Sequence, residues 1–215
     1  IIGKKKLVAF DEAQRIKNIG LVIKLMVDNI ENVKVLATGS SAFELANEVN
    51  EPLTGRKWEY HIYPVSWKEY ADYAGNYEAN QHLETRIIYG MYPEVITAKG
   101  EEEETLKQIA GSYLYKDLLS LKEIRKPDLL EKLLHAIALQ LGSEVSLNEL
   151  SSLLGVDKKT VSQYLQLLEK VFVIFQLNSL SRNMRNEIMR SRKIYFYDTG
   201  IRNAIINNYN DLNNR

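Results

Sequence analysis

Short apolar segments alternate with amphipathic ones along the first third of the chain. Residues 7–10 (LVAF) and 33–37 (VKVLA) have the length of buried strands, and residues 19–29 carry apolar side chains at helical spacing. A second helix over 42–50 and a strand of alternating character over 58–63 follow. This order of short strands and helices predicts a parallel sheet with crossover helices, which is an α/β arrangement.

The pattern becomes mostly helical after Pro64. Helical spacing covers residues 66–74 and 80–92, and a longer helix is predicted over 101–121 before Pro127 interrupts the pattern. The fold class that we expect is therefore α/β followed by mostly α.

Capping patterns mark the helices of the last third. An amphipathic helix over 128–141 precedes a short helix that Ser146 opens, and Glu149 stands three residues on, as in a capping box. Asp157 is placed to cap the helix DKKTVSQYLQLLEK. Two apolar segments follow on either side of a basic stretch. Helix, short helix, turn, helix and two-stranded ribbon is the order of a winged helix-turn-helix.

Composition excludes some classes of function. Lys+Arg and Asp+Glu both number 28, so no overall charge draws the chain to nucleic acid, and such contact needs a local patch. There is no cysteine, which excludes disulfides and thiolate metal sites and suits a cytoplasmic location. The apolar runs are far shorter than the ~20 residues of a membrane span, so we expect no membrane association through a span.

Polar residues follow the first two strands. The acids Asp11 and Glu12 come directly after the first strand, and the hydroxyl residues Thr38, Ser40 and Ser41 follow the second. Ligands bind at the carboxyl ends of parallel strands, where such side chains gather. Adjacent acids suit a magnesium–nucleotide site, in which the first orients hydrated Mg²⁺ and the second polarises the attacking water. The plainer interpretation of Asp11 and Glu12 is a solvated strand end. The plainer interpretation of residues 38–41 is a tight turn in which Ser40 or Ser41 caps the next helix.

An arginine stands close to the predicted third strand. Arg56 follows a glycine in LTGR, directly before the segment 58–63. An arginine in such a place stabilises transition-state charge on a phosphate, in cis or across a subunit interface. A surface salt bridge is the alternative.

Together these segments resemble a known family. The order FDEAQ, ATGSS, LTGR and YPVSWKEY is similar to that of the AAA+-like P-loop ATPases of bacteria and archaea, in which a winged helix and a nuclease-like domain of unknown function follow the core. GMYPEV and KIYFYDTGIR match its downstream segments. The resemblance implies ATP and Mg²⁺ as cofactors, Asp11 (the metal residue) and Glu12 as Walker B acids, and residues 38–41 as the sensor-1 region.

One motif of that family is missing. The phosphate-cradling loop G-x-x-x-x-G-K-[ST] does not occur in the sequence, and residues 3–5 (GKK) lack its second glycine and its hydroxyl. We therefore expect the chain to correspond to the second half of such an ATPase and, by itself, not to be catalytically competent. The nuclease residues of the family are also missing, so no nuclease activity is predicted.

The resemblance divides the chain into four parts. They are a partial ATPase core with a remnant of the P-loop-type sheet, a helical lid-like region, the winged helix and the start of a truncated C-terminal domain. Their predicted bounds are 1–65, 66–127, 128–192 and 193–215.

The winged helix brings candidate DNA contacts. Its recognition helix and basic stretch carry residue types that reach phosphates and base edges. The candidates are Lys158, Lys159, Thr160, Ser162, Gln163, Gln166, Arg182 and Arg185. The predicted partners are double-stranded DNA, or, for a winged helix that serves as a lid or interaction module, a protein or a second copy of the chain.

Overall fold

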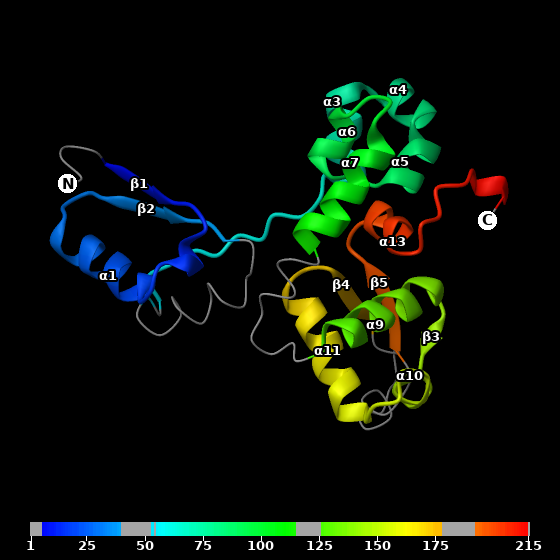
Figure 1. The fold of residues 1–215 in the computed structure, drawn as a ribbon. Helices are drawn as coiled ribbons and strands as arrows, with labels where there is room; N and C mark the ends of the chain where they lie inside the picture. Colours follow the sequence, from blue (N-terminus) through cyan, green and yellow to red (C-terminus); the bar gives the residue numbers. More distant parts are fainter. Residues whose placement is uncertain (1–5, 40–52, 54, 115–125, 178–191, 215) are drawn as a thin grey trace, which may run out of the picture. The chain divides into compact units, whose positions relative to one another are not determined.

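The computed structural model describes residues 6–39, 53, 55–114, 126–177 and 192–214, without the side chains of 112–114. The chain divides into two compact units, Ile1–His61 and Ile62–Arg215 (Figure 1). Each unit is described by itself.

The first unit is built on two parallel strands. β1 (Leu7–Phe10) pairs with β2 (Lys34–Ala37), and the connection runs through a 3₁₀ turn, η1 (Ala13–Arg15), and helix α1 (Ile19–Asn29). Helix α1 covers one face of the strands, where Ile19 and Ile23 are buried. The predicted helix over 19–29 and the two strands are confirmed.

The predicted strand over 58–63 is not formed. Trp58, Tyr60 and Ile62 alternate along this segment, and these residues are 86%, 83% and 94% exposed. None of these residues belongs to a strand. The period-two pattern is a strand signal, but a strand also needs a neighbour that satisfies its backbone groups, and the described residues of this unit supply none.

The second unit begins with short helices. They are α3 (Trp67–Ala74), α4 (Asn76–Gln81), α5 (Leu83–Tyr89), α6 (Pro93–Thr97) and α7 (Glu102–Gln108), which continues as the π-helix η2 (Ile109–Leu114). Ser66 and Glu69 form a reciprocal capping box at the start of α3, which was not predicted from the sequence. The single helix predicted over 101–121 is two helical segments as far as residue 114, and its remainder lies outside the described residues.

Helices and strands then alternate around a small sheet. The elements are α9 (Pro127–Leu139), β3 (Glu144–Val145), α10 (Leu147–Leu154), α11 (Lys158–Lys170), β4 (Ile174–Leu177), β5 (Arg192–Phe196), α13 (Thr199–Ile205) and η3 (Leu212–Asn214). The sheet is antiparallel in the order β3-β5-β4. Its inner face and the helices share one buried apolar cluster, which includes Leu130, Leu165 and Ile194.

The capping box predicted for α10 is not formed. Ser146 is the N-cap residue, but its side chain accepts no capping hydrogen bond. The Glu149 carboxylate instead accepts a 2.9 Å hydrogen bond from Gln140 Nε2, at the end of α9. A tertiary partner has therefore taken the side chain that the local motif required.

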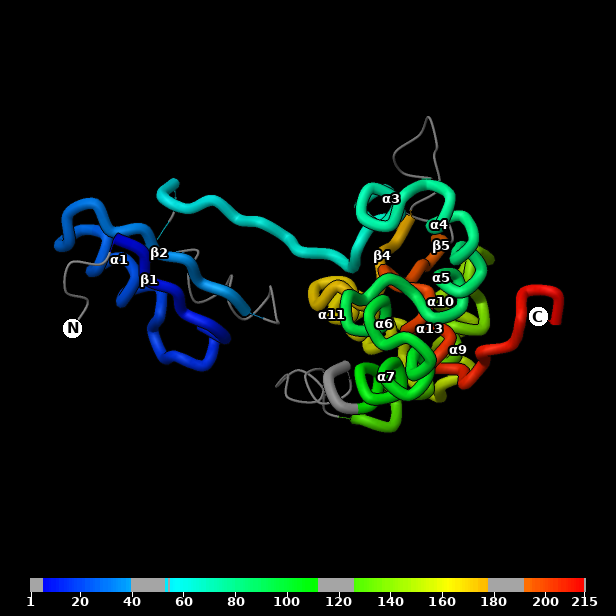
Figure 2. The backbone as a smooth tube through the Cα atoms, turned by 90° about the horizontal axis from the view of Figure 1, so that it is seen from above, coloured from blue at the N-terminus to red at the C-terminus, as the bar shows by residue number. Residues whose placement is uncertain are grey.

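The end of α5 and the start of α13 interlock. Figure 2 shows these helices, more than 100 residues apart in sequence, lying close together. Asn203 Nδ2 donates to the backbone oxygen of Ile88 at 2.6 Å, and Asp198 Oδ2 accepts from the backbone nitrogen of Met91 at 2.6 Å. A side chain on Gly200 would collide with the carbonyl group of Tyr89. The segments GMYPEV and KIYFYDTGIR thus meet in space.

An aromatic cluster holds the first residues of the second unit against the small sheet. Tyr63 stacks on Tyr197 with ring centroids 5.1 Å apart, and its edge meets Phe172 at 5.7 Å. Phe175 stacks on Tyr195 at 5.6 Å. The segment after the exposed residues 58–62 is therefore fixed by ring packing.

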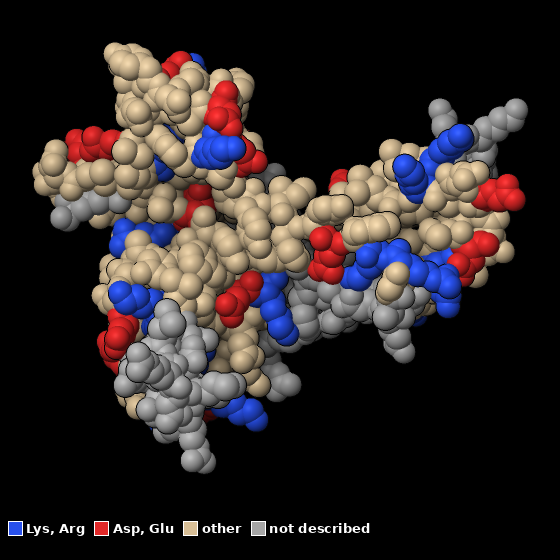
Figure 3. Space-filling model, turned by 180° about the vertical axis from the view of Figure 1, so that it is seen from behind, with Lys and Arg blue, Asp and Glu red and all other residues tan. Residues whose placement is uncertain are grey.

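Two further properties are the distribution of charged side chains and the length of the helices. On the face drawn in Figure 3, Lys and Arg side chains lie interspersed with those of Asp and Glu. Within the described ranges, each helix is too short or too polar to cross a lipid bilayer.

Candidate functional site

The carboxyl ends of β1 and β2 bring Asp11 and Thr38 together. Phe10 lies opposite Ala37 in the parallel register, so the next residue of each strand falls at the same edge. Thr38 Oγ1 donates a 2.6 Å hydrogen bond to Asp11 Oδ1. The backbone reinforces this contact, because Thr38 donates to the Phe10 carbonyl and accepts from the Ala13 nitrogen, both at 2.8 Å. Two candidate residues separated by 27 positions thus share one site.

Glu12 has an unusual backbone and a positioned side chain. Its φ of 49° lies in the left-handed region, which costs a residue with a Cβ atom of the order of 1 kcal/mol. Gln14 Nε2 donates to Glu12 Oε2 at 2.8 Å, and Arg15 Nε lies 3.7 Å from the same oxygen. Neither Gln14 nor Arg15 was singled out from the sequence. Both could have been found from their position in the sequence, because a 3₁₀ turn directly after Glu12 brings residues two and three positions on close to its side chain.

Arg56 lies elsewhere in the first unit. Its Nη1 donates to Asp28 Oδ1 at 2.6 Å, in an ion pair whose side chains are 57% and 38% exposed. Asp28 is close to the end of α1, which returns from the carboxyl edge of β1 to the amino edge of β2. The structure therefore brings Asp11 and Thr38 together and pairs Arg56 with another residue.

Four candidate residues lie outside the described residues. They are Ser40, Ser41, Arg182 and Arg185.

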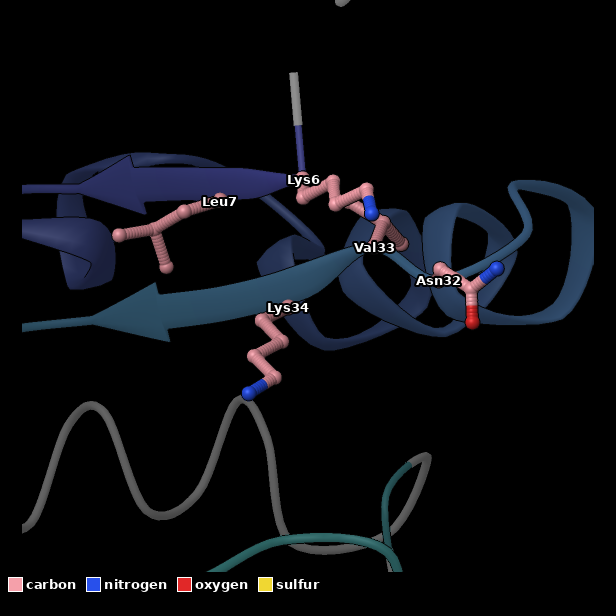
Figure 4. Close-up of a pocket in the computed structure, with 5 residues that line it drawn as sticks. All are labelled: Lys6, Leu7, Asn32, Val33 and Lys34. Atoms are coloured by element: carbon pink, nitrogen blue, oxygen red, sulfur yellow. The ribbon is translucent and has the colours of Figure 1, made fainter. Parts of the chain in front are cut away.

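A hollow lies at the opposite edge of the two strands. Its lining consists of Lys6, Leu7, Asn32, Val33 and Lys34 (Figure 4). These residues precede or begin the strands, so the hollow is at their amino ends, away from Asp11 and Thr38. Its lining contains no acid, so this hollow offers none of the carboxylate oxygens that a magnesium site requires.

The acid site fits a metal that keeps most of its water. In the part of the chain that the structure describes, no group of three or more His, Cys, Asp and Glu residues is placed to hold a metal ion. Mg²⁺ is commonly bound by one or two carboxylates together with water and substrate phosphates. The exposed Asp11 carboxylate, already oriented by Thr38, suits that mode of binding.

The candidate DNA residues of α11 differ in availability. Lys158, Lys159 and Gln163 are exposed, and Ser162 is partly buried. Thr160 is engaged in the helix cap, because its backbone nitrogen and its hydroxyl donate to the two carboxylate oxygens of Asp157 at 2.9 and 2.8 Å. These hydrogen bonds lower the pKa of the Asp157 carboxyl group. The predicted cap at Asp157 is confirmed.

Comparisons with known proteins match two parts of the chain to two different family models. Residues 1–71 match the model of an AAA domain, which supports an AAA-like, ATPase-type domain in that part. Residues 80–212, more than half of the chain, match the family described as Domain of unknown function (DUF8612). The chain belongs to that family.

Relatives occur in bacteria and archaea. An uncharacterized protein of Haemophilus influenzae is 27% identical over 186 residues, which cover 81% of this chain and 46% of the relative. Uncharacterized proteins of Methanocaldococcus jannaschii and Mycobacterium tuberculosis are 25% and 26% identical over 94% and 95% of this chain. The matches cover 48% and 45% of those two relatives. The chain spans about half the length of the curated relatives that it matches.

Proposed function

We propose that the carboxyl edge of β1 and β2 contributes the acidic part of a magnesium–ATP site, and that the full-length protein hydrolyses ATP. The observation that carries this proposal is the hydrogen bond between Thr38 and Asp11 at the ends of adjacent parallel strands. The match of residues 1–71 to an AAA domain supports the same class of chemistry.

Each residue has a distinct role in this proposal. When bound, Mg²⁺ supplies positive charge that offsets the charge on the ATP phosphates. Asp11 would hold water molecules of the hydrated ion, and Thr38, whose hydroxyl donates to that carboxylate, would fix its orientation. Glu12 would accept a hydrogen bond, and then the proton, from the attacking water. The oxygen of that water bonds to the γ-phosphorus as the bond from this phosphorus to the bridging oxygen of ADP breaks, which gives ADP and inorganic phosphate. The predicted role of Arg56 on a phosphate stays a prediction, and in this structure its Nη1 donates to Asp28 Oδ1.

Glu12→Gln in the full-length protein tests the assignment. The variant keeps the shape of the side chain but loses the basic oxygen, so we expect ATP binding to persist while turnover falls at least about 10²-fold. ATP binding is measured by equilibrium titration and turnover by phosphate release. Glu31→Gln, an exposed acid on a loop of the same unit, is the matched control and should leave both unchanged. Normal turnover in Glu12→Gln contradicts the role of Glu12, and no magnesium-dependent turnover in the unaltered protein contradicts the ATPase proposal.

A second function rests on the arrangement of the second unit. We propose that α9, β3, α10, α11, β4 and β5 form a winged helix and that α11 contacts double-stranded DNA. The order β3-β5-β4 of the antiparallel sheet, with α10 and α11 joined through Gly155 in a left-handed conformation, favours this class of motif. Exposed Lys158 and Lys159 at the start of α11 support contact with phosphates.

Duplex titration of the full-length protein tests this second function. Binding should weaken with salt, and the combined change Lys158→Ala, Lys159→Ala should reduce the salt slope by about 2, because each lysine neutralises one phosphate. Lys68→Ala removes an exposed lysine of α3, with its side chain 88% exposed, and serves as the control. If the unaltered protein shows no salt-dependent duplex binding, the winged helix is better explained as a protein-interaction module.

A further inference from the structure

One face of α11 presents a stripe of long polar side chains. Lys159, Gln163, Gln166 and Lys170 are all exposed, at intervals of four, three and four residues. Because an α-helix turns once every 3.6 residues, these intervals place all four on one face. The apolar residues Val161, Tyr164, Leu165 and Leu168 are buried on the opposite face.

The stripe carries positive charge and amides but no carboxylate. The two acids next to it are engaged elsewhere. Asp157 caps the helix through Thr160. Glu169 accepts hydrogen bonds from the backbone nitrogen and the Nε2 of Gln176, at 3.2 and 2.8 Å. The four residues of the stripe therefore offer two positive charges and two amides to an acidic partner.

The stripe is compatible with a position along the major groove of a duplex. Lys159 and Lys170 are 11 positions apart, which corresponds to about 16 Å along an α-helix. A helix that lies in the major groove runs along it, so the long side chains of residues near its two ends can extend to the phosphates that border the groove. Gln163 and Gln166 lie between them and would face the base edges. Glutamine pairs with adenine, by donating to N7 and accepting from N6.

We propose that α11 lies in the major groove of double-stranded DNA with Gln163 and Gln166 reading adenine, and with Lys159 and Lys170 on the flanking phosphates. This inference rests on the DNA-binding function proposed above and adds its specificity. It also revises the predicted contact set. Thr160, whose hydroxyl donates to Asp157, is left out, Gln166 is kept and Lys170 is added.

A duplex containing 7-deazaadenine tests the adenine contact. This base lacks the N7 acceptor of the major groove and leaves the minor groove unchanged. We expect the full-length protein to bind an alternating A·T duplex about five-fold or more tightly than its 7-deazaadenine counterpart. The variant Gln163→Ala, Gln166→Ala should bind both duplexes equally. Gln108→Ala, an exposed glutamine at the end of α7, should keep the full discrimination.

Lys170→Ala separates the phosphate contact from base reading. The variant should reduce the salt slope by about 1 and leave the ratio between the two duplexes unchanged. All four stripe residues are exposed, so the variants should match the unaltered protein in thermal unfolding.

The outcomes separate the proposed base contacts from the DNA-binding function on which they rest. If the unaltered protein binds duplex with a salt dependence but does not discriminate between the two duplexes, the glutamine contacts are wrong while DNA binding stands. If Lys170→Ala leaves the salt slope unchanged, the phosphate contact of the stripe is wrong. If no salt-dependent duplex binding occurs at all, both the stripe and the DNA function are overturned.

Discussion

Asp198 is a buried carboxylate that joins two helices. It is 4% exposed, and its two oxygens accept hydrogen bonds from the backbone nitrogens of Met91 and Ile201. Burial raises the pKa of the Asp198 carboxyl group, although these hydrogen bonds and the charge of Arg86 act in the opposite direction. The folded state therefore holds a proton on Asp198 more tightly than the unfolded chain does.

That raised pKa predicts a pH dependence of stability. Between about pH 3.9, the ordinary pKa of Asp, and the raised value, the folded state binds more protons, so the contribution of Asp198 falls as pH rises. Relative to Asp198→Asn, the free energy of unfolding of the unaltered protein should therefore decrease across this window, as measured by urea unfolding at several pH values. The variant should also be less stable overall by about 1–3 kcal/mol, because an amide nitrogen would face a backbone donor.

Glu69→Gln tests the opposite pH dependence of stability, because the pKa of Glu69 is lowered and not raised. Hydrogen bonds from the backbone and the side chain of Ser66 lower the pKa of the Glu69 carboxyl group. Relative to this variant, the unaltered protein should gain stability as pH rises through the range in which that carboxyl group ionises. For Asp198, a difference in the free energy of unfolding between the unaltered protein and Asp198→Asn that does not change with pH would contradict the raised pKa of the buried carboxyl group.

At the scale of elements, glycine allows α5 and α13 to approach closely. Gly90 ends α5 with a φ of 80°, and a Cβ atom on it would collide with the Asp198 carboxylate. Gly100 has a similar φ of 82°, but apart from Gly100 and its two chain neighbours no residue has an atom within 4 Å of the position that its Cβ would take. The two glycines share a backbone conformation and differ in their surroundings.

Alanine substitutions at Gly90 and Gly100 separate the cost of steric crowding from the cost of backbone strain. Gly90→Ala should lower the free energy of unfolding by about 3 kcal/mol, from a left-handed residue with a side chain and an overpacked joint. Gly100→Ala should cost about 1 kcal/mol, from the backbone alone. Chemical denaturation of both variants measures the difference. Equal losses would show that the contact with Asp198 adds nothing.

Local patterns predicted elements better than partners. The periodicity of residues 19–29 predicted the bounds of α1, and Asp157 caps α11 as its position indicated. Ser146 and Glu149 fit a capping box equally well, yet Gln140 takes the glutamate. Several weak interactions compete for one side chain, and the distances that decide among them are set by packing.

At the scale of the whole molecule, sequence and structure divide the chain at a similar place. The AAA match ends at residue 71 and the DUF8612 match begins at residue 80, while the compact units separate between His61 and Ile62. In the second unit, Leu106, Leu130, Ile194 and Ile201 belong to one buried cluster. Residues from three of the predicted parts thus contribute to a common core, and α13 closes it on α5.

The sequence by itself determined the strands and helices whose signals are local, and the presence of acids and a hydroxyl at two successive strand ends. It also placed Asp11 and Thr38 at one edge, because the strand-helix-strand order requires a parallel pair. Only the tertiary structure decided that Arg56 pairs with Asp28 and that Asp198 meets Gly90. Such contacts join residues that are far apart along the chain, and no periodicity in the sequence encodes them. The contact of Asp198 follows from burial, which selects partners that leave few polar groups unsatisfied. The exposed pair of Arg56 and Asp28 follows from the path of the chain, which brings the two side chains together.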